Sequence, residues 1–261
     1  MLGVFVTLRR VIKIKTLLLD IETSPNTVHV WGLREQDISI NQILESSYVL
    51  CWAAKWLGHG PVMFARTTNP AKGSTRSMIV KVHKLLSEAD SVIHYNGSKF
   101  DIPTLNKEFI LHGLTHPAPY KQMDLLKVAR EQFRFTSNKL DYVADALGLG
   151  KKTQHEGHML WVKCMADDPQ AWHRMEKYNK NDVVLLEKLY YKLLPWMKTH
   201  TNQSLYEEEA VCPTCGSSKF QRRGFAYTQA GKYRRFQCQT CSSWFRGTTS
   251  VMPKGKKMVA I

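Results

Sequence analysis

The sequence predicts a mixed α/β domain, in which helices flank a central mixed sheet, followed by a small cysteine-rich module. Over residues 1–200, short apolar runs with the length of strands alternate with segments whose apolar residues recur at helical spacing. Beyond them, two cysteine pairs stand in a stretch too short to build a large core. The 261 residues suit one full domain and one small module.

The first predicted element is a strand that delivers two carboxylates. In KTLLLDIETSP, Leu17, Leu18 and Leu19 form an apolar run typical of a buried strand, and Asp20 and Glu22 follow it. Residues two apart on a strand share a face, so both carboxylates point the same way. Such a pair is common at turns, and it indicates a site only in combination with other residues.

A hairpin and a helix come next. The runs YVLCWAAKWLG and PVMFARTT, separated by a Gly-His-Gly-Pro turn, predict two paired strands. The apolar spacing from Thr75 to Ser87 predicts a helix that returns the chain to the sheet.

The segment SVIHYNGSKFDIPTL predicts a strand over residues 91–94, a Gly-containing turn, and Asp101 at the start of a helix through Leu105 and Ile110. Taken alone, Asp101 would be interpreted as a helix cap. Asp124, in KQMDLLKVAR, either ends a further strand or caps a helix.

The segment YNKNDVVLLEKLYYKLL has helical apolar spacing, which puts Tyr178 and Asp182 one turn apart on one helix face. Such a pair would ordinarily be a surface contact. Together with the earlier carboxylates, however, it offers oxygen ligands for hard divalent cations. Two such cations, roughly 3.5 to 4 Å apart, can activate a water and stabilise the leaving oxygen in phosphodiester hydrolysis. A phenol beside them can orient the water.

These three segments resemble the exonuclease motifs of the DnaQ-like superfamily, in its DEDDy-type subgroup with a Tyr in the third motif. The resemblance extends over residues 13–196, matches all five motif positions, and is to 3′–5′ exonucleases of phage and bacterial type. It implies a ribonuclease H-like fold and two catalytic Mg²⁺ or Mn²⁺ ions. By the resemblance, Tyr178 acts on the nucleophilic water, and the metal ligands are Asp20, Glu22, Asp101 and Asp182. The segment LDYVADALGLGKK also resembles the helix before the third motif.

The cysteine-rich module predicts a zinc ribbon. Its two Cys-x-x-Cys pairs, 22 residues apart, are Cys212, Cys215, Cys238 and Cys241. A structural Zn²⁺ would stabilise so small a domain, whereas disulfides, the alternative, are disfavoured because no secretory signal precedes the pairs. Cys51 and Cys164 stand singly in apolar settings, which indicates buried packing.

Ten Lys and Arg and no Asp or Glu occur in residues 210–261, so this region carries +10 of the formal +15. Aromatic residues alternate with the basic side chains that we expect to bind nucleic acid, which are Arg222, Arg223, Lys232, Arg234 and Arg235. Two alternatives remain: the aromatic side chains form the core of the ribbon, or this surface docks a protein.

We expect residues 1–200 to form the exonuclease domain, 201–210 a linker, 211–250 the ribbon and 251–261 a flexible basic tail. The opening segment MLGVFVTLRRVIKIK is too short and too charged for an anchor and predicts a further strand. No membrane association is expected, and the cytoplasm of a bacterium or of a virus-infected host cell is the expected location.

The resemblance therefore predicts an exonuclease acting on 3′ ends of single-stranded or fraying DNA. Replication or repair proteins are further candidate partners. An exoribonuclease of the same chemistry is the nearest alternative, because no residue in the sequence plainly indicates how the 2′-hydroxyl that distinguishes RNA from DNA would be recognised. The alternative from another functional class is a non-catalytic nucleic-acid-binding adaptor. The intact carboxylates argue against it, because a degenerate site would be expected to lose one of them.

Overall fold

The computed structural model describes residues 14–151, 153, 154 and 156–252, which form two compact units. The first unit spans Lys15–Tyr190, and the second takes in the described chain from Tyr191 onward. The strand expected before residue 14 and the basic tail beyond residue 252 lie outside the described residues. Within the described chain, no helix has the length and apolar character needed to cross a membrane.

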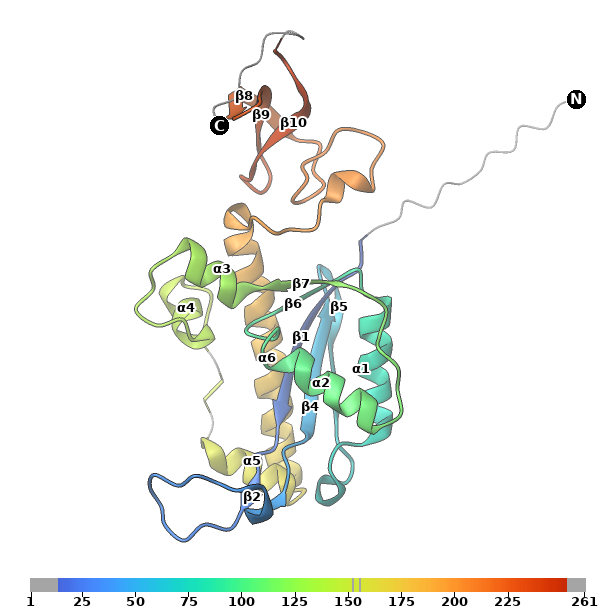
Figure 1. The fold of residues 1–261 in the computed structure, drawn as a ribbon, viewed down its shortest axis with the longest axis vertical. Coiled ribbons are helices and arrows are strands. Elements are labelled where there is room, and N and C mark those ends of the chain that lie inside the picture. The colour runs from blue at the N-terminus through green and yellow to red at the C-terminus, as the bar shows by residue number, and fades with distance from the viewer. Residues whose placement is uncertain (1–13, 152, 155, 253–261) are drawn as a thin grey trace, which may run out of the picture. The chain divides into compact units, whose positions relative to one another are not determined.

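The first unit is built on a five-stranded sheet with the order β5-β4-β1-β6-β7 (Figure 1). Its strands are β1 (Thr16–Thr23), β4 (Val49–Trp56), β5 (His59–Arg66), β6 (Ser91–His94) and β7 (Lys121–Asp124). β1, β4 and β5 pair antiparallel, whereas β6 and β7 continue the sheet parallel to β1. The predicted mixed α/β fold and the predicted β4–β5 hairpin are therefore confirmed.

Helices cover both faces of this sheet. They are α1 (Arg76–Glu88), α2 (Asp101–Leu111), α3 (Leu125–Gln132), α4 (Leu140–Ala146), α5 (His158–Met165) and α6 (Pro169–Leu193). Single turns of 3₁₀ helix occur at Ile40–Gln42, Pro70–Lys72, Leu194–Trp196 and Gln203–Leu205. The helices predicted near residues 75–87 and after residue 100 correspond to α1 and α2.

The alternation of β1 separates the core from the carboxylates. Leu17, Leu19 and Ile21 pack with α1 and α2 in one buried cluster that also contains Met78 and Phe109. Because successive side chains of a strand point to opposite faces, the even-numbered residues of β1 face the other side, where α6 lies (Figure 1).

A second buried cluster fills the space between the sheet and helices α5 and α6. It contains Leu50, Trp172 and Met175 together with Cys51 and Cys164. Both cysteines are fully buried, which confirms the predicted packing role, and burial raises the pKa of the Cys51 thiol far above its usual range.

Between β1 and β4, a small two-stranded ribbon was not predicted. It consists of β2 (Thr27–Val28) and β3 (Ile43–Glu45), and its connecting loop leaves Trp31 and Leu33 almost completely exposed.

The second unit contains a three-stranded antiparallel sheet with the order β10-β9-β8. Its strands are β8 (Phe220–Thr228), β9 (Gly231–Cys238) and β10 (Trp244–Ser250). The rings of Phe220, Phe236 and Phe245 contact one another, with centroids 5.3 to 5.6 Å apart. These three rings are the small core of the unit.

Candidate active site and metal centre

Three of the four predicted acidic ligands come together in the first unit. Asp20 and Glu22 lie on β1 and Asp182 lies on α6, and each offers a carboxylate oxygen within 4.8 Å of the others. Asp182 is only 2% exposed. Carboxylates held this close together repel one another unless cations compensate their charge, and these oxygens are the donors that Mg²⁺ or Mn²⁺ prefer.

Asp101 adjoins this acidic group but is not one of the three. It is the first residue of α2, and its Oδ1 accepts a hydrogen bond of 3.1 Å from the N–H of Ile21, between Asp20 and Glu22 on β1. Burial raises the pKa of Asp101 to about 7, although the Ile21 N–H favours the ionised form. A cation bound beside β1 would favour ionisation of this carboxyl group.

Tyr178 lies on α6, one turn before Asp182, and is 7% exposed. Its ring meets Trp161 edge-on at 5.9 Å. Tyr178 and Asp20 also line a cavity of about 670 Å³, together with Arg130, Asn138 and Lys139. The site therefore opens into a space that is partly basic. Sequence reasoning missed Arg130 and Lys139, because neither belongs to a motif and their common cavity depends on the tertiary fold.

Asn179 is a further residue that sequence reasoning missed. It is fully buried, and its Nδ2 donates a hydrogen bond of 2.6 Å to Oδ2 of Asp20. A hydrogen bond of this kind fixes the orientation of a carboxylate. The available sequence signal was its place between Tyr178 and Asp182, on a helix already assigned to the site.

Asp124 organises the turn that leads to Asp101. It ends β7 and also caps α3 through the N–H of Leu126 at 3.1 Å, so both interpretations of this residue hold. The same carboxylate accepts hydrogen bonds from the N–H of Asn96 at 2.9 Å and from Oγ of Ser98 at 2.7 Å. Asp124 thus ties the turn between β6 and α2 to the neighbouring strand.

His94, the last residue of β6, contacts this turn. The N–H of Gly97 donates to its Nδ1 at 3.1 Å, which leaves Nε2 to donate to Gln122 at 3.1 Å. A Cβ on Gly97 would lie 2.5 Å from Cγ of His94, so no other residue fits there. Burial lowers the pKa of His94, and the ring is neutral in this arrangement.

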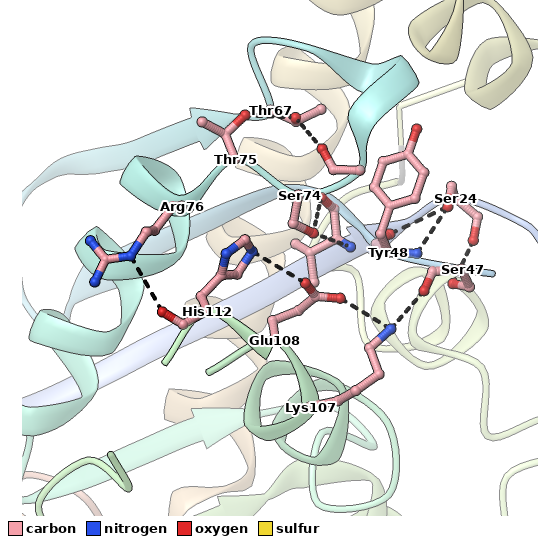
Figure 2. Close-up of polar contacts among 12 residues, drawn as sticks. Ser24, Ser47, Tyr48, Thr67, Ser74, Thr75, Arg76, Lys107, Glu108 and His112 are labelled. Carbon is pink, nitrogen blue, oxygen red and sulfur yellow. Dashed lines mark hydrogen bonds and ion pairs between the residues drawn. The ribbon is translucent and has the colours of Figure 1, made fainter. Parts of the chain in front are cut away.

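The chain just beyond Glu22 is held by a second polar network (Figure 2). Ser24 and Tyr48 exchange backbone and side-chain hydrogen bonds, and Oγ of Ser47 donates to the carbonyl of Ser24 at 2.7 Å. Nζ of Lys107, on α2, donates to the carbonyl of Ser47 at 2.6 Å. These bonds connect the end of β1 to β4 and to α2.

The four cysteines of the second unit also form a ligand group. Their sulfur atoms lie within 4.8 Å of one another, with 3.7 Å between Cys212 and Cys241 and 3.6 Å between Cys215 and Cys238. Disulfide sulfurs would be about 2.05 Å apart, whereas Zn–S bonds of about 2.3 Å give a tetrahedral edge of about 3.8 Å. The four residues are therefore compatible with a zinc ribbon.

The five predicted nucleic-acid contacts lie on β8 and β9. Arg222, Arg223, Arg234 and Arg235 are exposed, and Lys232 is half-buried. Several of these cations lie over aromatic rings: Nζ of Lys232 is 4.1 Å from the centroid of Phe225. No Asp or Glu occurs within residues 210–261 to neutralise them.

Comparisons with known proteins agree on the fold of the first unit. A family model described as the RNase H superfamily matches residues 51–194, a range that contains Asp101, Tyr178 and Asp182. The chain is structurally similar to the family B DNA polymerase from the hyperthermophilic archaeon Pyrobaculum calidifontis, with a TM-score of 0.55 and 20% identity. That match covers 70% of this chain but only 25% of the polymerase. No curated protein matches the sequence.

Proposed function

This chain belongs to the RNase H superfamily, and from this premise we propose that it is a metal-dependent 3′–5′ exonuclease acting on single-stranded or fraying DNA. One observation carries the proposal. Asp20 and Glu22, from β1, share a centre with Asp182, from α6, although about 160 residues separate them in sequence. The RNase H-like fold and this carboxylate group together support the binding of divalent metal ions and a nucleic acid as the substrate.

The carboxylates of Asp20, Glu22, Asp101 and Asp182 would hold two Mg²⁺ or Mn²⁺ ions. When bound, such ions supply an activated water and stabilise charge on the leaving oxygen. The hydroxyl of Tyr178 would orient the attacking water as a hydrogen-bonding group. 

The polarity of the reaction and the preference for DNA rest on different arguments. The 3′–5′ direction follows from the resemblance of the three motifs to DnaQ-like exonucleases. The similarity to part of a DNA polymerase favours DNA over RNA. Replication or repair proteins are accordingly the candidate protein partners.

The C-terminal module is proposed to be a ribbon stapled by one structural Zn²⁺ on Cys212, Cys215, Cys238 and Cys241. All four positions of a tetrahedral zinc would be filled by protein, which leaves none for catalysis. Its basic strands would bind nucleic acid. We assign the nuclease to residues 1–200, the linker to 201–210 and the ribbon to 211–250.

The test is a nuclease assay on a 5′-labelled single strand with Mg²⁺ or Mn²⁺. The expected result is a ladder that shortens one nucleotide at a time, and Asp101→Ala abolishes it. Glu88→Gln is the matched control, because it removes a partly exposed carboxylate that pairs with Lys15 at 3.5 Å on the edge of the domain.

Each other outcome has a definite meaning. If only RNA is shortened, the enzyme is an exoribonuclease. If a mononucleotide leaves a 5′ end, the proposed polarity is wrong. If neither DNA nor RNA is cut with any divalent cation, the chain is a binding adaptor and the proposal fails.

A further inference from the structure

The sheet of the second unit has two chemically different faces. Residues directly opposite each other in antiparallel strands share a face. The pairs Gln237–Trp244 and Arg235–Arg246 therefore lie on one face, and alternation along β9 adds Tyr233 to it. We call Tyr233, Arg235, Gln237, Trp244 and Arg246 the Arg–Trp face.

The opposite face carries the core of the unit. Phe236 pairs with Phe245 and with Arg222, and Phe225 pairs with Arg234. On this face the phenylalanine rings pack against one another, so their presence is explained by folding.

The aromatic side chains of the Arg–Trp face have another arrangement. Trp244 remains 53% exposed, and the guanidinium of Arg235 lies 5.0 Å from its ring centroid. The guanidinium of Arg246 lies 4.0 Å from the centroid of Tyr233. Both arginines are exposed. A half-exposed indole presents a flat ring on which another flat ring can stack.

The charge on this face identifies the class of ligand. Arg235 and Arg246 lie opposite each other, and residues 210–261 contain no carboxylate side chain to neutralise them. Two cations beside a half-exposed indole match a chain of phosphates with an unpaired base, since every base offers a flat ring for stacking. Arginine is also the cation best suited to bind phosphate through two donors.

We propose that the Arg–Trp face is the surface on which the ribbon binds a single nucleic-acid strand. Arg235 and Arg246 contact phosphates, and the ring of Trp244 stacks on one unpaired base. This inference rests on the proposed function in taking a nucleic acid as the substrate. It places Arg235 in the binding surface and assigns Arg222, Lys232 and Arg234 to the opposite face, where they contribute only long-range attraction.

The experiment measures binding of the full, zinc-loaded chain to a labelled oligo-dT by fluorescence anisotropy, without Mg²⁺ or Mn²⁺ so that no cleavage occurs. Trp244→Ala is expected to raise Kd about tenfold, and the slope of log Kd against log salt does not change. Arg246→Gln also raises Kd and reduces that slope by about 0.7, the value for one lost phosphate contact on a single strand. Trp244→Phe, which keeps a flat ring, retains most of the affinity.

A control lies on the opposite face. Tyr227→Ala removes a ring that is more accessible than that of Trp244, 72% exposed against 53%. It is expected to change Kd less than about twofold. A zinc content of one ion per chain establishes that a variant keeps its ribbon. If Trp244→Ala loses zinc, the effect of Arg246→Gln on Kd tests the inference instead.

Three outcomes would overturn the inference. In the first, Arg246→Gln leaves Kd unchanged, and in the second, Tyr227→Ala on the opposite face raises Kd as much as Trp244→Ala does. The third outcome is a wild-type chain that binds a protein through the Arg–Trp face and does not bind oligo-dT. A separate cleavage assay with Mg²⁺ distinguishes this failure from failure of the nuclease proposal. Intact cleavage without face-dependent binding refutes only the inference. Face-dependent binding without cleavage refutes only the nuclease.

Discussion

Asn179 and Asp20 are joined by a hydrogen bond of 2.6 Å in the interior of the first unit. In the proposed function Asp20 is a metal ligand, and loss of a residue that orients such a ligand usually costs about 10- to 100-fold in metal affinity or activity. We predict that Asn179→Ala raises the Mg²⁺ concentration needed for half-maximal cleavage by about that factor. An Mg²⁺ titration of the initial rate measures it.

Asn181→Ala is the matched control, because Asn181 lies two residues further on α6 and its Nδ2 donates to the carbonyl of the exposed Lys151 rather than to a carboxylate of the acidic group. Its Mg²⁺ requirement should equal that of the wild type. Saturating Mg²⁺ should restore much of the activity of Asn179→Ala. If it restores none, Asn179 has a role other than positioning Asp20.

A second prediction concerns the stability cost of the site. Asp101 is 4% exposed, and ionising it there is costly because water is excluded. Asp101→Asn keeps an oxygen for the Ile21 N–H and removes the charge. Without divalent cations, this variant should unfold at a temperature at least about 3 °C higher than the wild type, yet lack nuclease activity.

Asp90→Asn tests whether burial is the reason. Asp90 accepts a similar backbone hydrogen bond, from Lys15 at 2.7 Å, but it is exposed. Its replacement should leave the melting temperature unchanged. Equal stabilisation by both variants would contradict the argument from burial.

A third prediction follows from the depressed pKa of His94. Burial lowers this pKa in the folded state, with a smaller opposing effect from Asp124, so the unfolded chain takes up the proton first as the pH falls. The contribution to stability is therefore complete above about pH 6.5 and is lost below it. Melting temperatures between pH 8 and pH 5 should decline less steeply for His94→Asn than for the wild type.

Replacing the exposed His59 by Asn should preserve the wild-type decline. If His94→Asn declines as steeply as the wild type, another group is responsible for the loss of stability in acid.

The fourth prediction separates the two units. Cys238→Ser should release zinc, unfold the ribbon and weaken binding to DNA, because so small a domain depends on its metal. Cleavage of short oligomers should persist, since the acidic group lies entirely within Lys15–Tyr190. Zinc analysis, binding and cleavage are measured on the same preparation. Loss of all three together would show that the units are not separable.

The sequence predicted the elements that carry the site because their patterns are local. Three leucines in a row predicted β1, and the position of Asp20 and Glu22 on one common face of the strand followed from the alternation of side chains alone. The start of α2 at Asp101 and the helical spacing of Tyr178 and Asp182 were predictable for the same reason.

What the sequence did not predict depends on contacts between distant segments. The hydrogen bond of Asn179 to Asp20 spans 159 residues, and the cavity brings Arg130 and Lys139 beside Tyr178. In the ribbon, basic residues that are neighbours in sequence proved to lie on opposite faces, and Trp244 was missed because it belongs to another strand.

The alternation of β1 also constrains how this gene can change. One face of the strand packs in the hydrocarbon cluster with α1 and α2, and the other carries Asp20 and Glu22 beside α6, so inserting or deleting a single codon within residues 16–23 would turn carboxylates into the hydrocarbon cluster and leucines toward the acidic group. The strand therefore tolerates the substitution of one residue for a similar one but not an insertion or a deletion. The exposed loop between β2 and β3 has no such restriction, and variation in length among descendants of this protein should accumulate there.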